Sequence, residues 1–211
     1  MVYNNFFIRI ITSIFLIILF IYLIYETQYI IFFIYFIYFL ILIELLIYFR
    51  KNLLILIISL FYLSLSFLSI IYYLDNFFDK ILLIYTILIV TSFDTFSYLF
   101  GSYYGNKKIT PVISPNKTYI GLFSGILSSI IIIFFINYFV NYFSQYSLLI
   151  YTITLILFSF IGDIFQSFLK RKSMIKNSSN FLPGHGGFFD RFDSLIMVFL
   201  YLFIYNFYFK L

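Results

Sequence analysis

Residues 182–194, LPGHGGFFDRFDS, combine the residue types that bind phosphate groups and metal ions. A glycine-rich turn stands directly before a predicted helix that opens with carboxylates. Backbone N–H groups at a helix N-terminus suit a phosphate, and paired carboxylates suit Mg²⁺. An N-capping aspartate and an intrahelical ion pair would explain Asp190 and Arg191, but not a histidine among three glycines. The pattern favours a phosphate and metal site with these members: His185, Gly186, Gly187, Asp190, Arg191 and Asp193.

A second polar group follows one face of the apolar run at 147–169. Within GDIFQSFLKR, at 162–171, Asp163, Ser167 and Lys170 are spaced by four and three residues, so they share a helix face. Lys170 is explained equally well as a lysine that extends from the helix end to the membrane surface. Asp163 is harder to explain in that way, because it lies nearly two turns inside the helix.

A third group lies in residues 91–121, TSFDTFSYLFGSYYGNKKITPVISPNKTYIG. A charge inside a span costs about 2.5–3.5 kcal/mol, so Asp94 should face protein or water, and a structural hydrogen bond between helices is the alternative explanation. The loop that follows combines glycines, lysines and hydroxyls, which suit an anion, although basic topology signals explain some of the lysines. We expect Ser114, Lys117 and Thr118 to bind phosphate.

Membrane-spanning helices must position these residues. Hydrophobic residues make up 64% of the 211 residues and charged residues only 10%, unlike a soluble domain. A spanning helix needs about 20 apolar residues. The chain offers such runs at 7–25, 29–49, 53–74, 81–100, 119–140, 147–169 and 189–209. The sequence therefore predicts an all-α, polytopic integral membrane protein of about seven transmembrane helices.

Basic residues are divided unequally between the two sides that alternate spans define, with 11 on one side and 2 on the other. Basic loops remain in the cytoplasm. We therefore expect a cytoplasmic N-terminus, cytoplasmic loops 50–52, 101–118 and 170–188, and an active site on that side. We interpret residues 1–80 as scaffold helices, without recognisable motifs, and residues 81–211 as the catalytic region.

The composition also limits the chemistry and the partners. The chain has no cysteine, which excludes disulfides, thiolate metal sites and a cysteine nucleophile. Its net charge of +5 is explained by basic loops beside the membrane, so no nucleic-acid partner is expected. The sequence leaves the oligomeric state open, a homodimer included.

Residues 167–193, SFLKRKSMIKNSSNFLPGHGGFFDRFD, resemble the signature of the phosphatidate cytidylyltransferase family. In that signature a Ser-x-x-Lys-Arg element leads to Pro-Gly-His-Gly-Gly and then to Asp-Arg-x-Asp. Upstream segments resemble further family motifs in the family's order: Asp94-Thr95, Gly101, Gly105, Ser114 to Thr118, and Gly162-Asp163. The resemblance covers about residues 91–194.

The resemblance implies an enzyme that transfers a cytidylyl group from CTP to phosphatidate, at a membrane whose lipid supplies the second substrate. It implies Mg²⁺ held by Asp163 and Asp190, with a second cation left open. The implied catalytic residues are Asp163, Lys170, Arg171, His185, Asp190, Arg191 and Asp193. The implied substrate-binding residues are Asp94, Ser114, Lys117, Thr118, Ser167, Gly186 and Gly187.

Three positions depart from the family pattern. Ile120, Gln166 and Asn177 stand where the family usually has acids, and the N-terminal region is shorter than in typical members. The residues of the proposed metal and phosphate site are nevertheless all present. We interpret the chain as a reduced but working enzyme.

Two other functions fit parts of the sequence. An ion-coupled transporter would use Asp94 and Asp163 as an ion path, but the polar residues gather at one face and leave the outer half of the last four spans unmarked. A CDP-alcohol phosphotransferase would also act on a nucleotide and a lipid. The Asp-Gly…Ala-Arg…Gly…Asp…Asp pattern of that family is not found in the sequence.

Overall fold

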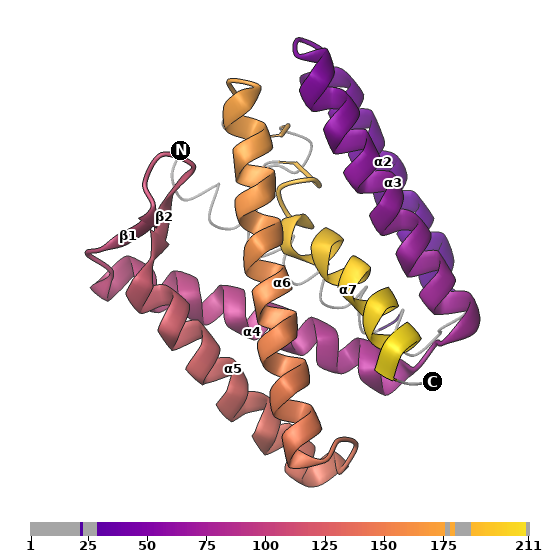
Figure 1. Ribbon diagram of the computed structural model, residues 1–211, viewed down its shortest axis with the longest axis vertical. Helices are drawn as coiled ribbons and strands as arrows, with labels where there is room; N and C mark the ends of the chain where they lie inside the picture. The colour runs from indigo at the N-terminus through magenta and orange to yellow at the C-terminus, as the bar shows by residue number, and fades with distance from the viewer. Residues whose placement is uncertain (1–21, 23–28, 176–177, 180–186, 210–211) are drawn as a thin grey trace. The chain divides into compact units, whose positions relative to one another are not determined.

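Figure 1 shows the computed structural model of the chain, which describes residues 22, 29–175, 178–179 and 187–209. The first predicted span, at 7–25, lies outside these residues apart from Tyr22. His185, Gly186 and Asn177 also lie outside the described residues.

Six helices account for most of the described residues. They are α2 (Ile30–Tyr48), α3 (Leu53–Asn76), α4 (Lys80–Tyr104), α5 (Tyr119–Val140), α6 (Gln145–Lys172) and α7 (Asp193–Phe209). The first five are long and apolar enough to cross a membrane, and α7 is a shorter apolar helix. Each coincides with a predicted apolar run, and the ends differ by at most four residues. A helical membrane protein is confirmed, whereas the count of seven spans stays a prediction.

The chain divides into two compact units. Unit 1 contains residues 1–80 and 169–193, and unit 2 contains residues 81–168 and 194–211. Helix α6 begins in unit 2 and ends in unit 1, so most of the signature segment belongs to the same unit as α2 and α3. The functional assignment of a scaffold and a catalytic region stays a prediction.

In unit 1, α2 and α3 pack against each other and are joined by a short turn (Figure 1). Asn52 ends that turn and caps α3, because its side-chain oxygen accepts a hydrogen bond from the Ile55 amide at 3.4 Å. Between the helices, the hydroxyls of Tyr38 and Ser66 are 2.5 Å apart, and the Tyr38 ring packs on Phe67. Such polar contacts hold helices together where lipid removes the hydrophobic driving force.

In unit 2, hydrogen bonds between side chains join α4 to α5 and α6, and join α6 to α7. The pairs are Ser92 with Ser129, Tyr85 with Asn137, Thr86 with Tyr151, and Thr154 with Tyr201. All of these groups lie within apolar helices, where a polar group without a partner is costly. The four bonds therefore fix which helices of unit 2 are neighbours.

Helices α4 and α5 approach so closely that their backbones leave room only for glycine. A Cβ on Gly121 would lie 2.6 Å from the Ser97 carbonyl oxygen and 3.2 Å from the Cα of Gly101. Gly125, one turn further along α5, also faces α4, and a Cβ there would lie 2.9 Å from the Phe93 ring. Small residues permit this close helix packing in membranes.

The segment between α4 and α5 contains a β-hairpin, which the sequence analysis treated as a loop. Strands β1 (Lys108–Thr110) and β2 (Ser114–Thr118) pair antiparallel, with Thr110 opposite Ser114, Lys108 opposite Thr118, and a shift of register between these pairs. The strands are short, polar and interrupted by Pro115, so they lack the apolar alternation that marks a strand. The helical fold that the sequence predicts is therefore confirmed in outline, and it includes one small sheet in unit 2.

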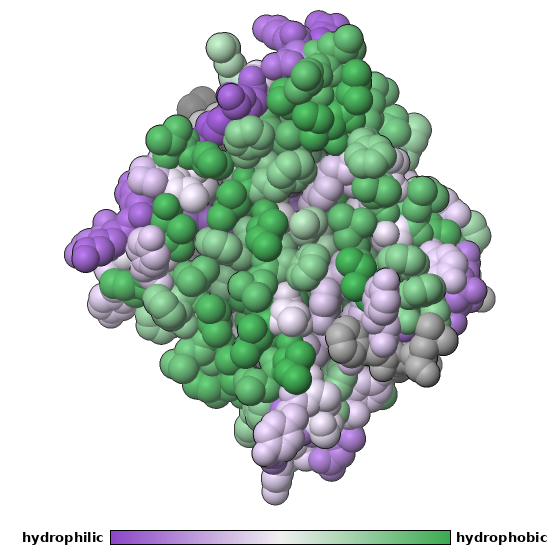
Figure 2. Space-filling view, in the orientation of Figure 1, coloured by the Kyte–Doolittle hydropathy of each residue, from purple (hydrophilic) through white to green (hydrophobic). Residues whose placement is uncertain are grey.

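Much of the exposed surface is hydrophobic. On α5, five exposed side chains recur every three or four residues and form one stripe: Phe123, Leu127, Ile131, Phe135 and Tyr138. Figure 2 shows hydrophobic residues over the surface that carries α5 and α6. Such a stripe of exposed apolar side chains is typical of a helix that faces lipid.

We expect Gly121→Ala to destabilise the protein, because its methyl group would overlap the Ser97 carbonyl oxygen. Overpacking of this kind costs about 1–3 kcal/mol. The measurement is the free energy of unfolding in detergent micelles, with Ser128→Ala, at a half-buried position of α5, as the control. Equal stability of the two variants would show that α4 and α5 do not pack this closely.

Candidate functional site

Asp190 and Lys170, two of the predicted catalytic residues, form an ion pair in unit 1. Lys170 lies in the last turn of α6, and its Nζ is 2.8 Å from Asp190 Oδ1, with side chains only 12% and 13% exposed. Asp190 Oδ2 accepts hydrogen bonds from the amides of Ser178 at 2.9 Å and Gly187 at 3.3 Å. One carboxylate therefore joins the end of α6 to both flanks of residues 180–186.

A second carboxylate, that of Glu44 in α2, binds the same two flanks. Glu44 is fully buried and accepts four hydrogen bonds. The donors are the hydroxyls of Ser178 and Ser179 and the amides of Phe188 and Phe189. Unit 1 thus places two carboxylates around one segment of the family signature.

Sequence reasoning missed Glu44, although a signal was present. It is the only charged residue in α2, IIFFIYFIYFLILIELLIY, and an ionisable residue inside a span is a functional-site hypothesis by default. Its partners are 134 to 145 residues away in the chain, so no local motif connects them. The interpretation of residues 1–80 as a scaffold without motifs overlooked this contact.

Gly187 lies where three polar side chains converge. A Cβ at this position would lie 2.7 Å from both Glu44 Oε2 and Ser179 Oγ, and it would collide with the Ser178 hydroxyl. The absence of a side chain is therefore required by the packing around Glu44. The predicted role of Gly187 in substrate binding stays a prediction.

In unit 2, three predicted residues come together from β2, α6 and α4. Lys117 forms an ion pair with Asp163, and its Nζ lies 4.7 Å from the centre of the Phe160 ring. Asp94 accepts a hydrogen bond from the Ser194 hydroxyl at 2.9 Å, and the charges of Asp163 and Lys117 both act on it. The bond to Ser194 is the interhelical hydrogen bond that was the alternative explanation of Asp94.

Thr118 has a direct structural role. Its side chain is 5% exposed, and its hydroxyl oxygen accepts a hydrogen bond from the Gly121 amide at 3.1 Å, which caps α5. Cβ atoms placed on Gly101 or Gly105 would also meet this side chain. A phosphate-binding role for Thr118 stays a prediction.

The remaining described residues of the predicted site lie near the ends of elements. They are Ser114 at the start of β2, Ser167 and Arg171 in the last two turns of α6, Arg191 just before α7, and Asp193 at its first position. Arg171 and Arg191 are exposed, while Ser114, Ser167 and Asp193 are half-buried. Their catalytic and substrate-binding roles stay predictions.

Two of the three departures from the family pattern can be placed. Gln166 is fully buried in α6, whereas Ile120, in the first turn of α5, is 44% exposed. An acid at position 166 would therefore be a buried charge, which requires a cation or hydrogen-bond donors. An acid at position 120 would carry no such requirement.

The chain offers oxygen ligands for a cation in both units. Asp94 and Asp163 belong to unit 2 and Asp190 to unit 1. Among the residues that the structure describes, no three histidine, cysteine, aspartate or glutamate side chains form a group that could hold a metal. Mg²⁺ is commonly bound by one or two carboxylates, with water and phosphate oxygens as its other ligands. Within each unit, the aspartates fit that pattern.

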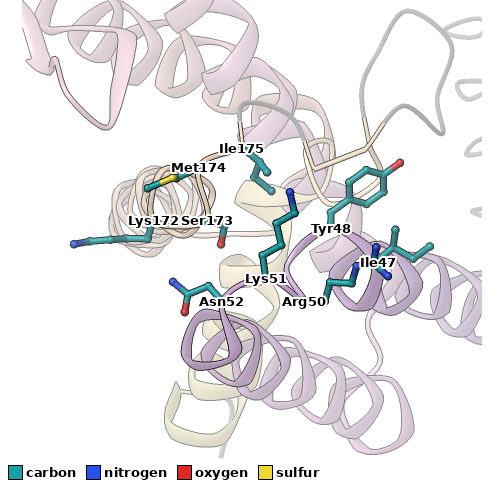
Figure 3. Close-up of a pocket in the computed structure, with 9 residues that line it drawn as sticks. All are labelled: Ile47, Tyr48, Arg50, Lys51, Asn52, Lys172, Ser173, Met174 and Ile175. Atoms are coloured by element: carbon teal, nitrogen blue, oxygen red, sulfur yellow. The ribbon is translucent and has the colours of Figure 1, made fainter.

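A hollow of about 540 Å³ opens in unit 1 beside the turn between α2 and α3 (Figure 3). Its lining includes three basic residues, Arg50, Lys51 and Lys172. Figure 3 shows the turn next to residues 172–175, at the end of α6. Parts of two predicted cytoplasmic segments, 50–52 and 170–188, therefore lie on the same side of unit 1.

A double-mutant cycle tests the contact between Lys117 and Asp163. Lys117→Met and Asp163→Asn each leave one partner without its counter-charge, where the side chains are 16% and 24% exposed, so each should cost about 1–3 kcal/mol. The double variant should show a coupling of about 0.5–3 kcal/mol. The free energies of unfolding in detergent give this coupling. In a control cycle, Lys108→Met, on β1, replaces Lys117→Met, and its effect should add to that of Asp163→Asn. Additivity in both cycles would contradict the ion pair.

Comparison with known proteins gives an independent line of evidence. Relatives named phosphatidate cytidylyltransferase from Staphylococcus epidermidis, Staphylococcus haemolyticus and Staphylococcus aureus are 39%, 38% and 39% identical over 117 residues. The matched region covers 55% of this chain and 45% of each relative, so the chain spans about half the length of these relatives. The model of the cytidylyltransferase family matches residues 9–209. Because that match extends over nearly the whole sequence, the chain belongs to the cytidylyltransferase family.

Proposed function

We propose that the chain transfers a cytidylyl group from CTP to phosphatidate, giving CDP-diacylglycerol and pyrophosphate. The observation that carries the proposal is the geometry of Asp190, which joins Lys170 to both flanks of the glycine-rich signature segment. Membership of the cytidylyltransferase family and the names of the relatives support the same reaction. No observation favours the ion-coupled transporter or the CDP-alcohol phosphotransferase.

In the proposed reaction, a phosphate oxygen of phosphatidate attacks the α-phosphorus of CTP. One P–O bond forms while the bond from the α-phosphorus to the oxygen that bridges it to the β-phosphorus breaks, and the electron pair leaves with pyrophosphate. Transfers of this type depend chiefly on positioning and on neutralisation of charge. The protein therefore needs fixed cations beside the triphosphate rather than a covalent nucleophile.

We assign the phosphate contacts to basic residues of both units. Lys117 and Lys170 each neutralise a carboxylate, and we propose that they also bind substrate phosphates. Arg171 and Arg191 are exposed near Lys170 and Asp190 in the sequence, and they supply further cations. Ser114 and His185 complete this assignment as hydrogen-bonding groups.

We assign Mg²⁺ to Asp163 and Asp190, since both are carboxylates and each belongs to a motif of the family signature. When bound, the ion would neutralise the charge that develops on the triphosphate. The assignment leaves room for a second cation.

The proposed site faces the cytoplasm, in a protein with seven spans and a cytoplasmic N-terminus. Two observations support this orientation. Basic residues are divided unequally between the two predicted sides of the membrane, and Arg50, Lys51 and Lys172 line one hollow of unit 1. CTP would reach this site from the cytoplasm. Phosphatidate would enter from the adjoining lipid leaflet.

Asp163→Asn and Asp190→Asn should each reduce cytidylyl transfer at least about a hundredfold, because each removes a ligand charge worth several kcal/mol. The assay follows radiolabelled CTP into lipid with purified protein, phosphatidate and Mg²⁺. Asp75→Asn, at an exposed position near the end of α3, is the control and should keep wild-type activity. Near-normal turnover by both site variants would contradict the metal assignment.

Single cysteines test the orientation, because the natural chain has none. Asn106 and Met174 are exposed on the predicted cytoplasmic side, and Tyr146, which is 84% exposed, lies on the other side. An impermeant thiol reagent applied from outside should label Tyr146→Cys, and it should label Asn106→Cys and Met174→Cys only after the membrane is opened. The reverse pattern would overturn the cytoplasmic assignment.

A further inference from the structure

We infer that Glu44 is a positioning residue for the family signature: it holds both flanks of residues 180–186 and, through them, the pair of Lys170 and Asp190. Glu44 need not touch either substrate for this role. The effect on activity rests on the proposed function, whereas the effect on the flanks does not.

The four hydrogen bonds of Glu44 are divided evenly between the two flanks. Oε1 accepts from the Ser179 hydroxyl at 2.6 Å and from the Phe188 amide at 2.8 Å. Oε2 accepts from the Ser178 hydroxyl at 3.2 Å and from the Phe189 amide at 2.9 Å. Each oxygen therefore bridges one residue before the segment 180–186 and one residue after it.

The acceptor capacity of this carboxylate is fully used. An ionised carboxylate offers about four lone-pair sites, and here each receives a donor. Its surroundings are buried, since Glu44, Ser178 and Phe189 are each 0% exposed. A buried carboxylate is costly unless such bonds are made, and bonds from N–H and O–H groups to an ionised oxygen are the stronger kind. The donors of the two flanks thus satisfy the buried carboxylate of Glu44.

Glu44 and Asp190 share their partners. Ser178 donates its hydroxyl to Glu44 and its amide to Asp190, and the amide of Gly187 also donates to Asp190. Phe188 and Phe189, which Glu44 binds, directly precede Asp190 in the chain. Loss of Glu44 would therefore release the backbone that places the Asp190 carboxylate opposite Lys170.

The packing of α2 on α3 does not depend on this carboxylate. Tyr38 and Ser66 join these helices, and each helix carries fully buried apolar residues, such as Leu45 in α2 and Ile70 in α3. All four hydrogen bonds of Glu44 go instead to residues 178–189. A change at Glu44 should therefore affect the signature segment more than the helix pair.

The test compares Glu44→Gln with Leu45→Ala in full-length protein. Glu44→Gln keeps the shape, but its NH₂ group cannot accept a bond from a backbone amide. Leu45→Ala leaves a cavity at the next, fully buried residue of α2 and leaves the carboxylate in place. Hydrogen exchange of the amides at 187–190 should become at least about tenfold faster in Glu44→Gln, which corresponds to about 1.4 kcal/mol. Leu45→Ala should not show this local change.

Cytidylyl transfer is measured on the same variants, below the unfolding temperature of each. We expect kcat of Glu44→Gln to fall at least about tenfold, while Leu45→Ala keeps the wild-type kcat. If Glu44→Gln does not fold, the double variant Ser178→Ala with Ser179→Ala is used instead. It retains the carboxylate and both backbone donors, and it should show a smaller change of the same kind.

The possible outcomes separate this inference from the proposed function. Unchanged exchange at 187–190 in Glu44→Gln would overturn the inference, and so would faster exchange with an unchanged kcat in an active wild-type protein. An inactive wild-type protein would overturn the proposed function alone, and exchange would still decide whether Glu44 holds the flanks. Faster exchange together with a lower kcat, both absent from Leu45→Ala, supports the positioning role.

Discussion

A carboxylate buried in an apolar protein has to be paired with a cation or hydrogen-bonded, and this requirement decides where the polar segments of the chain lie. Glu44 and Asp190 meet it by binding the flanks of one glycine-rich segment in unit 1. Asp163 meets it through Lys117, and Asp94 through Ser194. The contacts that offset the cost of burying these carboxylates therefore also hold the predicted site residues in place.

Close packing, rather than charge alone, positions Lys117. The contact between α4 and α5 at Gly101 and Gly121 brings the two helix ends together, and Thr118 fits among these glycines and caps α5. Lys117 directly precedes this buried cap on β2. Gly101, Gly105 and Gly121, which the sequence places in a segment suited to an anion, therefore serve to pack α4 against α5 and Thr118. The same packing fixes the position of Lys117.

The sequence was sufficient for the helices and the family, because each relies on a local pattern. Apolar runs located the six described helices, and the motif around Asp190 indicated the family that the comparison confirms. The hairpin was missed because its strands are short and polar. The contacts of Glu44 were also missed, since they join segments more than 130 residues apart. Local spacing contains no information on such pairings, and the single acid within the apolar sequence of α2 was the signal that the sequence offered.

Ser178 is held by two carboxylates at once, and this arrangement has a consequence for sequence drift. A chain so rich in Ile, Leu, Phe and Tyr can exchange exposed apolar residues of α2 for others of similar volume at little cost. Glu44 is different, because its two oxygens and the amide of Ser178 belong to one cooperative network, in which losses are not additive. We therefore expect substitutions to be tolerated on the exposed side of α2 and to be costly at Glu44. The two flanks of residues 180–186 would thereby be held by a helix that contains no family motif of its own.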